Sequence, residues 1–209
     1  MNVLIIGATG PTGQQIVQQA LAQGHEVTAL VRSPEKLDMQ HDHLHVIKGD
    51  VLNPDSLQAA MSDQQAVISS LGSKLSFKPM TLLSEGTKNL VQAMQQHGVR
   101  RLVCITGMGA GDSKGHGGFV YDKLVLPLVL KEVYKDKDRQ EAVIQKSNLD
   151  WIIVRPAQLT NGSATENYHV FTDLNNVTGG KISRADTAGF MLQQLSSDRY
   201  LHQTPLISN

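Results

Sequence analysis

The fold of this chain is decided by one stretch near its start, Val3-Leu4-Ile5-Ile6-Gly7-Ala8-Thr9-Gly10-Pro11-Thr12-Gly13. Its four apolar residues predict a strand buried on both faces, and residues 12–23 repeat apolar positions at helical spacing. Gly7 permits a tight turn, Gly10 lets the backbone approach a diphosphate, and Gly13 lets helix and strand pack closely. The stretch therefore predicts a β–α unit that binds a dinucleotide at the helix N-terminus. A glycine-rich turn without a ligand is the alternative.

The rest of the chain alternates between strand-like and helix-like patterns. Strands are expected at residues 26–31, 44–48, 66–69, 101–105 and 151–154, and helices at 12–23, 54–61, 79–97 and within 119–147. This order predicts an α/β fold of the Rossmann type, with a doubly wound parallel sheet, as a single domain over residues 1–209. Residues 157–209 are polar at first, with a helix expected from Ser183 to about Leu195. We expect them to form a small C-terminal segment on the substrate side.

Composition excludes several classes of protein. The 209 residues carry 19 basic and 19 acidic side chains, so no basic surface for nucleic acid is indicated. The longest apolar run, Leu124–Leu130, is interrupted by Pro127 and is too short to cross a membrane. Cys104 is the only cysteine, so an internal disulfide is excluded. A cytoplasmic protein with no nucleic-acid or membrane partner is the simplest expectation, as a monomer or a homodimer.

The end of the second predicted strand indicates which dinucleotide is preferred. NAD-binding folds usually place an acidic residue there, to hold the ribose 2′-hydroxyl. Here the strand ends in Arg32, and Lys36 follows one helical turn later. A guanidinium group can pair with a 2′-phosphate, which favours NADP(H) over NAD(H). The alternative is an arginine that only meets solvent.

Further candidate residues follow the other strands, at the edge where open α/β sheets bind ligands. They are Asp50-Val51, Leu71-Gly72-Ser73, Thr106-Gly107 and Arg155-Pro156. The Asp50 carboxylate is suited to accept a hydrogen bond from an adenine amino group. The alternative for Asp50 is a carboxylate that caps a helix or closes a turn.

These motifs resemble those of the atypical short-chain dehydrogenases/reductases of the NAD(P)-binding, NmrA-like group, and among them the flavin reductase/biliverdin-IXβ reductase family. The matching segments are residues 7–13, 27–32, 49–52, 66–68, 71–72, 84–86, 89, 93–94 and 97–99. The resemblance implies a Rossmann domain, NADPH as cofactor, and reduction of flavins such as FMN or of related planar acceptors. Cofactor contacts are then expected from Gly7, Thr9, Gly10, Pro11, Thr12, Gly13, Arg32, Lys36, Asp50, Val51, Leu71, Gly72, Ser73, Thr106, Gly107 and Pro156.

The catalytic residues match the family less well. Short-chain dehydrogenases use a tyrosine and a lysine four residues apart, whereas Tyr134 and Lys137 are three apart on a predicted helix. That spacing still places both on one face, so they are our candidate catalytic residues. A charged helix surface over residues 131–139 is the alternative. The reductase family's serine and histidine fall on Gly107 and Gln158.

The substrate side is predicted from the segment that follows the fifth strand. Residues 107–118 hold six glycines and are expected to form a mobile loop, or else a flexible connector without a ligand role. Met108, His116 and Gln158 are our candidate substrate contacts. The alternating histidines of residues 41–45 lack a convincing set of further ligands, so no metal is expected.

Three functions are compatible with these residues. The first is an NADPH-dependent reductase that passes a hydride to a flavin, a quinone or a similar small planar acceptor. Such acceptors can take their proton from water, so a built-in acid is not essential. The second is a non-catalytic regulator that senses NADP(H), as the NmrA-like resemblance allows. The third, an epimerase that uses bound NAD(P), would require a firm Tyr/Lys pair.

Overall fold

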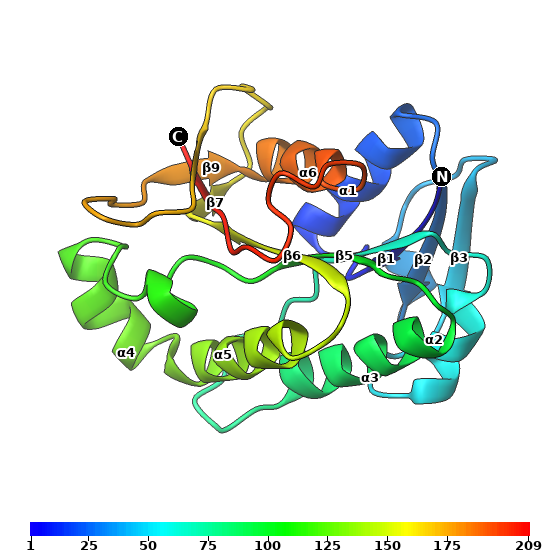
Figure 1. Cartoon of the computed structure of the whole chain (residues 1–209), viewed down its shortest axis with the longest axis horizontal. Coiled ribbons are helices and arrows are strands. Elements are labelled where there is room, and N and C mark those ends of the chain that lie inside the picture. The colour runs from blue at the N-terminus through cyan, green and yellow to red at the C-terminus, as the bar shows by residue number, and fades with distance from the viewer.

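A computed structural model describes all residues, 1–209, and confirms an α/β fold of the Rossmann type (Figure 1). The main sheet has eight strands in the order β3-β2-β1-β4-β5-β6-β10-β8, and β7 pairs with β9 separately. The strands are β1 (Asn2–Ile6), β2 (Glu26–Val31), β3 (Leu44–Lys48), β4 (Ala66–Ser69), β5 (Arg101–Ile105), β6 (Asp150–Pro156), β7 (Gln158–Thr160), β8 (His169–Phe171), β9 (Lys181–Ser183) and β10 (Leu206–Ser208). The helices are α1 (Pro11–Ala22), α2 (Pro54–Met61), α3 (Leu82–Gln96), α4 (Leu126–Leu128), α5 (Lys131–Gln145) and α6 (Arg184–Gln193).

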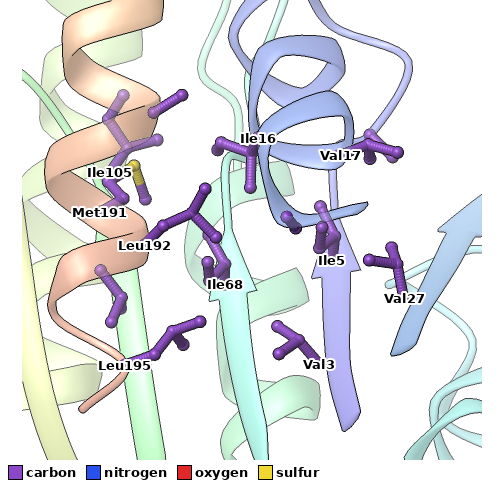
Figure 2. Packing of buried hydrophobic residues seen from close by; sticks show 14 of the residues in the cluster. Val3, Ile5, Ile16, Val17, Val27, Ile68, Ile105, Met191, Leu192 and Leu195 are labelled. Atoms are coloured by element: carbon purple, nitrogen blue, oxygen red, sulfur yellow. The ribbon is translucent and has the colours of Figure 1, made fainter. Parts of the chain in front are cut away.

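The sheet is covered on both faces. Helices α1 and α6 lie on one face, and α2, α3 and α5 lie on the other (Figure 1). Side chains therefore alternate along each strand. Val3 and Ile5 of β1 belong to the core beneath α1 and α6, shown in Figure 2, while Leu4 and Ile6 belong to the opposite core. This double burial explains why the first strand is apolar throughout.

The strand order reverses beside β1. Strand β1 pairs in parallel with β2 on one side and with β4 on the other, so successive crossovers run in opposite directions from it. The loops that follow β1 and β4 diverge at this point and leave a crevice at the carboxyl edge of the sheet. The turn with the three glycines lies at this crevice, since it directly follows β1.

The C-terminal segment contributes to the scaffold of the fold, a role that the sequence did not predict. Most of it builds the scaffold: α6 packs against α1, β10 extends the sheet in parallel to β6, and β8 adds an antiparallel edge. The predicted cap of α6 is confirmed, because Ser183 Oγ accepts a hydrogen bond of 2.8 Å from the Asp186 N–H. Four strands of this segment were not predicted, since each is three residues long.

The stretch expected to be helical over 119–147 is interrupted. A π-helical turn (Tyr121–Val125) precedes α4 and α5, and Pro127 lies in the first turn of α4. Asp136 on α5 is fully buried and accepts hydrogen bonds from the backbone N–H groups of Leu83 and Ser84 at 2.8 and 3.4 Å. Asp136 thus caps α3 from a neighbouring helix and fixes the position of α5 against it. No helix is both long and apolar enough to span a membrane.

Candidate functional site

A cavity of about 510 Å³ opens at the crevice beside β1, and we call it the turn cavity. It is built from the ends of β1, β2, β3, β4 and β5, which the parallel sheet brings to one edge. Thirteen of the sixteen residues predicted to contact a cofactor line it: Gly7, Thr9, Gly10, Pro11, Thr12, Gly13, Arg32, Asp50, Val51, Leu71, Gly72, Ser73 and Thr106. Residues scattered over a hundred positions of sequence therefore surround one space.

The three glycines of the turn have different physical roles. Gly7 has φ of +80°, and a Cβ there would lie 2.5 Å from the carbonyl oxygen of Ser70. A Cβ on Gly13 would overlap Gly7 and lie 2.8 Å from Ala8 Cα, so only glycine lets α1 approach β1. A Cβ on Gly10 would meet nothing closer than 3.4 Å. The chain itself therefore leaves the space above Gly10 free, which is where a ligand would contact the backbone.

The N-terminus of α1 faces the turn cavity without a side-chain cap. Gly10 occupies the cap position, and no acidic residue lies in the first turn. The first N–H groups of the helix and the positive end of its dipole are thus available to an anion. This arrangement fits the diphosphate of a dinucleotide.

Arg32 and Asp50 lie at the side of the turn cavity formed by β2 and β3. The guanidinium of Arg32 is exposed and forms no hydrogen bond or ion pair within the chain. Asp50 Oδ1 accepts a hydrogen bond of 2.9 Å from the Leu52 N–H. Asp50 therefore closes a turn, as its alternative interpretation predicted, and its second oxygen remains available at the cavity.

A second cavity of about 900 Å³ adjoins the first, and we call it the loop cavity. Its walls come from the glycine-rich loop, the π-helical turn, α5 and the residues after β6. They are Thr106, Gly107, Met108, Gly117, Gly118, Phe119, Val120, Tyr121, Val125, Leu130, Tyr134, Lys137, Pro156, Ala157, Gln158, Leu159 and Arg184. Four residues line both cavities: Thr106, Lys137, Leu159 and Arg184. The two spaces therefore share a wall.

Tyr134 and Lys137 lie together at this shared wall. Lys137 Nζ donates a hydrogen bond of 2.5 Å to the carbonyl oxygen of Thr106 and lies 4.5 Å from the centre of the Tyr134 ring. Burial lowers the pKa of Lys137 to about 8. Burial also raises the pKa of Tyr134 above its usual range, so the phenol stays protonated. A cation and a neutral hydroxyl group are thus placed at the meeting of the two cavities.

Tyr121, which the sequence did not single out, is the partner of Tyr134. Its hydroxyl oxygen lies 2.8 Å from the Tyr134 hydroxyl and 3.2 Å from the carbonyl oxygen of Met108. Burial is the main cause that raises the pKa of Tyr121. Tyr121 belongs to the π-helical turn, a distortion that is common at functional sites. The π-helical turn brings the Tyr121 hydroxyl next to the Tyr134 hydroxyl. The apolar helical pattern of the sequence does not indicate this distortion.

Hydrogen bonds join the glycine-rich loop to itself and to α5. Gly109 N–H donates to Ser113 Oγ at 2.9 Å, Gly111 N–H donates to Asp138 at 2.9 Å, and Lys114 pairs with Asp138 at 2.5 Å. The glycines make room for aromatic rings. A Cβ on Gly109 would lie 3.0 Å from Tyr134 Cε1, and one on Gly117 would overlap the ring of Tyr121.

A buried charge cluster fixes the floor behind Thr106. Thr106 Oγ1 donates to Glu141 at 2.7 Å, and Arg155 donates twice to the same carboxylate, at 3.0 and 2.6 Å. Arg155 also pairs with Asp112 of the loop. The cluster joins β5, α5, β6 and the loop, so the walls of the loop cavity are tied to one another.

Several predicted residues lie outside the turn cavity. Gly107, Pro156, Met108 and Gln158 line only the loop cavity. Two residues line neither cavity. Lys36 is exposed on a 3-10 turn, and His116 Nδ1 lies 2.9 Å from the Val177 carbonyl oxygen.

The surface histidines sit away from both cavities. His43 and His45 approach Glu26 on the edge of the sheet, at 2.5 and 3.6 Å.

Among the lining residues that the sequence did not indicate, Tyr121, Leu159 and Arg184 matter most for the site. The sequence predicted that Arg184 lies in the first turn of a helix, next to the cap residue Ser183. It did not indicate that Arg184 belongs to a binding site. Leu159 and Arg184 come from the C-terminal segment, and only the pairing of β7 with β9 brings them back over the end of β5.

Comparison with known proteins defines the family. Residues 7–198 match the model of NAD(P)H-binding domains. A chloroplastic protein of Arabidopsis thaliana, itself uncharacterized, is 33% identical over 196 residues, which cover 88% of this chain and 68% of that protein. The photosystem II assembly factor Ycf39 of Synechocystis is 26% identical over 215 residues, covering 98% of this chain and 61% of that protein.

Solved structures share the fold. ChuY, an anaerobillin reductase from Escherichia coli O157:H7, matches with a TM-score of 0.83 and 22% identity, covering 100% of this chain and 97% of that one. A short-chain dehydrogenase/reductase of Veillonella parvula, in complex with NADP, matches with a TM-score of 0.81 and 18% identity, covering 100% and 94%. Together, the family match and the geometry of the turn cavity identify this chain as a member of the NAD(P)H-binding family of Rossmann-fold proteins.

Proposed function

We propose that the chain is an NADPH-dependent oxidoreductase that transfers a hydride to a flavin, a quinone or a similar planar acceptor. The observation that carries this proposal is the wall shared by the two cavities. A dinucleotide held in the turn cavity and an acceptor held in the loop cavity would meet at Thr106 and Lys137. Holding the two reacting rings in contact supplies much of what a hydride transfer requires from a protein.

The turn cavity supports NADPH as the cofactor. The uncapped N-terminus of α1 and the free space above Gly10 suit a diphosphate, and bound NADPH would supply the hydride. Arg32 has no partner in the chain, and a 2′-phosphate would give its guanidinium a bidentate ligand. The NADP complex of the V. parvula protein, which has the same fold, agrees with this choice.

The loop cavity supports a planar acceptor. Phe119, Tyr121 and Tyr134 provide aromatic walls, and Leu130 and Leu159 provide aliphatic ones. Aromatic faces stack well on flat ring systems. The Lys137 ammonium and the Tyr134 hydroxyl would then hold a polar atom of the acceptor near the shared wall, and water would complete the protonation. The reductase activity named for ChuY, which shares the fold, is consistent with such an acceptor.

The direct test is to measure NADPH oxidation with FMN, riboflavin and quinones, together with a calorimetric titration of NADPH and NADH. We expect NADPH to bind more tightly than NADH and at least one of these acceptors to be reduced. Tight binding of NADPH without turnover of any acceptor would contradict the reductase proposal.

Arg32→Glu tests the choice of cofactor. Replacing the guanidinium by a carboxylate should weaken NADPH binding by a factor of about 100 and leave NADH binding much less affected, since one charge-assisted contact is lost and a repulsion is added. Lys181→Glu makes the same charge change at an exposed position outside both cavities and serves as the control. An unchanged ratio of NADPH to NADH affinity in Arg32→Glu would refute the assignment of the 2′-phosphate.

The second candidate function is an NADP(H)-sensing regulator of the NmrA-like kind. Two points favour it. The resemblance places the reductase family's serine and histidine at Gly107 and Gln158, neither of which supplies that chemistry, and one relative is an assembly factor. Such a regulator would bind NADPH through the same turn cavity. Binding without turnover in the test above is its expected result.

A further inference from the structure

We propose that Arg184 makes the loop cavity selective for acceptors that carry an anionic group, a phosphate or a carboxylate, on a planar ring system. This inference rests on the proposed function, because it concerns the acceptor of that reaction. It narrows the acceptor from any planar molecule to an acid, and it assigns the selection to one residue.

The charges of the loop cavity support this choice. Only two of its lining residues are charged, Lys137 and Arg184, and both are basic. No aspartate or glutamate lines the cavity. Glu141 lies behind Thr106, does not line the cavity, and shares the Arg155 guanidinium with Asp112. The charged side chains that line the cavity, and that a ligand would contact, are therefore both positive, which favours an anion.

Arg184 is the cation that we assign to the anionic group. Lys137 Nζ is bonded to the Thr106 carbonyl oxygen at 2.5 Å, which holds it at the shared wall where the reacting rings would meet. The only hydrogen bond of the Arg184 guanidinium runs from Nη1 to the side-chain oxygen of Asn161, at 2.7 Å. Asn161 is neutral, so the charge of Arg184 has no counterion in the chain. A guanidinium with free N–H donors and no counterion is well suited to a carboxylate or phosphate ligand.

The backbone beneath Arg184 is held firmly. Arg184 is the first residue of α6, directly after the cap Ser183. Asp186 accepts hydrogen bonds from the N–H groups of Thr165 and Glu166, both at 2.8 Å, and Gln19 of α1 donates to the Ala185 carbonyl oxygen at 3.0 Å. The guanidinium therefore extends from a fixed point, as a specificity residue requires.

The test compares FMN with riboflavin, two flavins that share the ring system and differ in a phosphate group. Their dissociation constants are measured by quenching of flavin fluorescence on the protein loaded with NADP⁺. We expect the wild type to bind FMN about 10- to 100-fold more tightly than riboflavin, the range of one charge-assisted contact. Arg184→Gln should abolish the preference by weakening FMN alone, and Arg184→Lys should restore part of it.

Lys181→Gln is the matched control, since it removes one positive charge three residues earlier, from an exposed position outside both cavities. It should leave the preference unchanged. The affinity for NADPH is measured in every variant, because Arg184 also lines the turn cavity. Equal affinity of the wild type for the two flavins, or failure of FMN to bind, overturns the inference. So does an Arg184→Gln protein that loses NADPH affinity and keeps the FMN preference.

The binding assay needs no turnover, so it separates this inference from the proposed function. A protein that binds FMN through Arg184 and yet never oxidises NADPH would contradict the reductase proposal alone. A protein that reduces FMN and riboflavin with equal efficiency, and binds them equally, would contradict the role of Arg184 alone.

Discussion

Substitution of Gly10 should weaken ligand binding and leave the stability of the fold almost unchanged. A methyl group there points into free space at an ordinary backbone φ of −75°. We expect Gly10→Ala to keep its unfolding free energy within about 1 kcal/mol of wild type. It should lower NADPH affinity at least about 10-fold, because the methyl group separates the diphosphate from the backbone.

Thermal melting and calorimetric titration check both halves of this prediction. Gly162→Ala, on an exposed loop away from the cavities, is the control. A Gly10→Ala protein that binds NADPH normally would show that the diphosphate does not contact this turn.

Lys137 predicts a pH dependence of stability. Its pKa is about 8 in the folded protein, because of burial, against an ordinary value of 10.5. Between these two values the unfolded chain binds more protons than the folded one, so the unfolding free energy rises with pH. Below pH 8 both states are protonated and this contribution stays constant. Relative to Lys137→Met, the wild type should therefore gain stability from about pH 8 to about pH 10.5.

Urea unfolding of both proteins across this range measures the difference. Lys135→Met, which alters an exposed lysine of the same helix, should show no such slope. If the difference in unfolding free energy between wild type and Lys137→Met stayed constant across the range, the pKa of Lys137 would not be lowered by burial.

The contact between the glycine-rich loop and the π-helical turn leads to a prediction at the scale of elements. A methyl group on Gly117 would overlap the Tyr121 ring, so Gly117→Ala should lower the unfolding free energy by about 1–3 kcal/mol. In a Tyr121→Ala background the same change should cost much less, because the ring is gone. Urea unfolding of the four proteins of this double-mutant cycle gives the coupling. Additive effects would contradict the contact.

Strands were predictable where the signal is local and repeated. Residues 26–31, 44–48, 66–69 and 101–105 were predicted with the bounds that the structure shows, because apolar β-branched runs end there at polar or glycine residues. Strands β7, β8, β9 and β10 carry no such signal. Each depends on a partner far along the chain, as Leu206 of β10 does on Arg155 of β6. Short strands of this kind are set by tertiary pairing.

The candidate site was likewise predictable in part: many residues of the turn cavity could be predicted, and several of those of the loop cavity could not. The residues of the turn cavity follow strands, and the rule that ligands bind at the carboxyl edge of a parallel sheet brought them together. The loop cavity follows no such rule. Tyr121 lies in a run that reads as an apolar helix, and its contact with Tyr134 depends on a π-helical turn that no spacing indicates.

At the scale of the whole molecule, two neighbouring residues of β10 allow a loss of global stability to be distinguished from a local change in the loop cavity. Leu206 is fully buried beside Met108 and Ala157, under the loop cavity, while the next residue, Ile207, is fully buried in the core beneath α6. Both Leu206→Ala and Ile207→Ala should lower the unfolding free energy by about 2–5 kcal/mol. Only Leu206→Ala should also weaken FMN binding, since it loosens the floor of that cavity.

Unfolding curves and flavin titrations of the two variants make the comparison, with NADPH affinity as a common reference. Equal loss of FMN binding in both variants would indicate a general loss of folded protein instead of a local effect.

The wall formed by Thr106, Lys137, Leu159 and Arg184 has a consequence for how the molecule responds to its surroundings. Two ligands that touch the same side chains do not associate independently. Thermodynamic linkage requires that each alters the other's dissociation constant by an identical factor. The cellular supply of reduced dinucleotide would then help to set how tightly the second ligand binds.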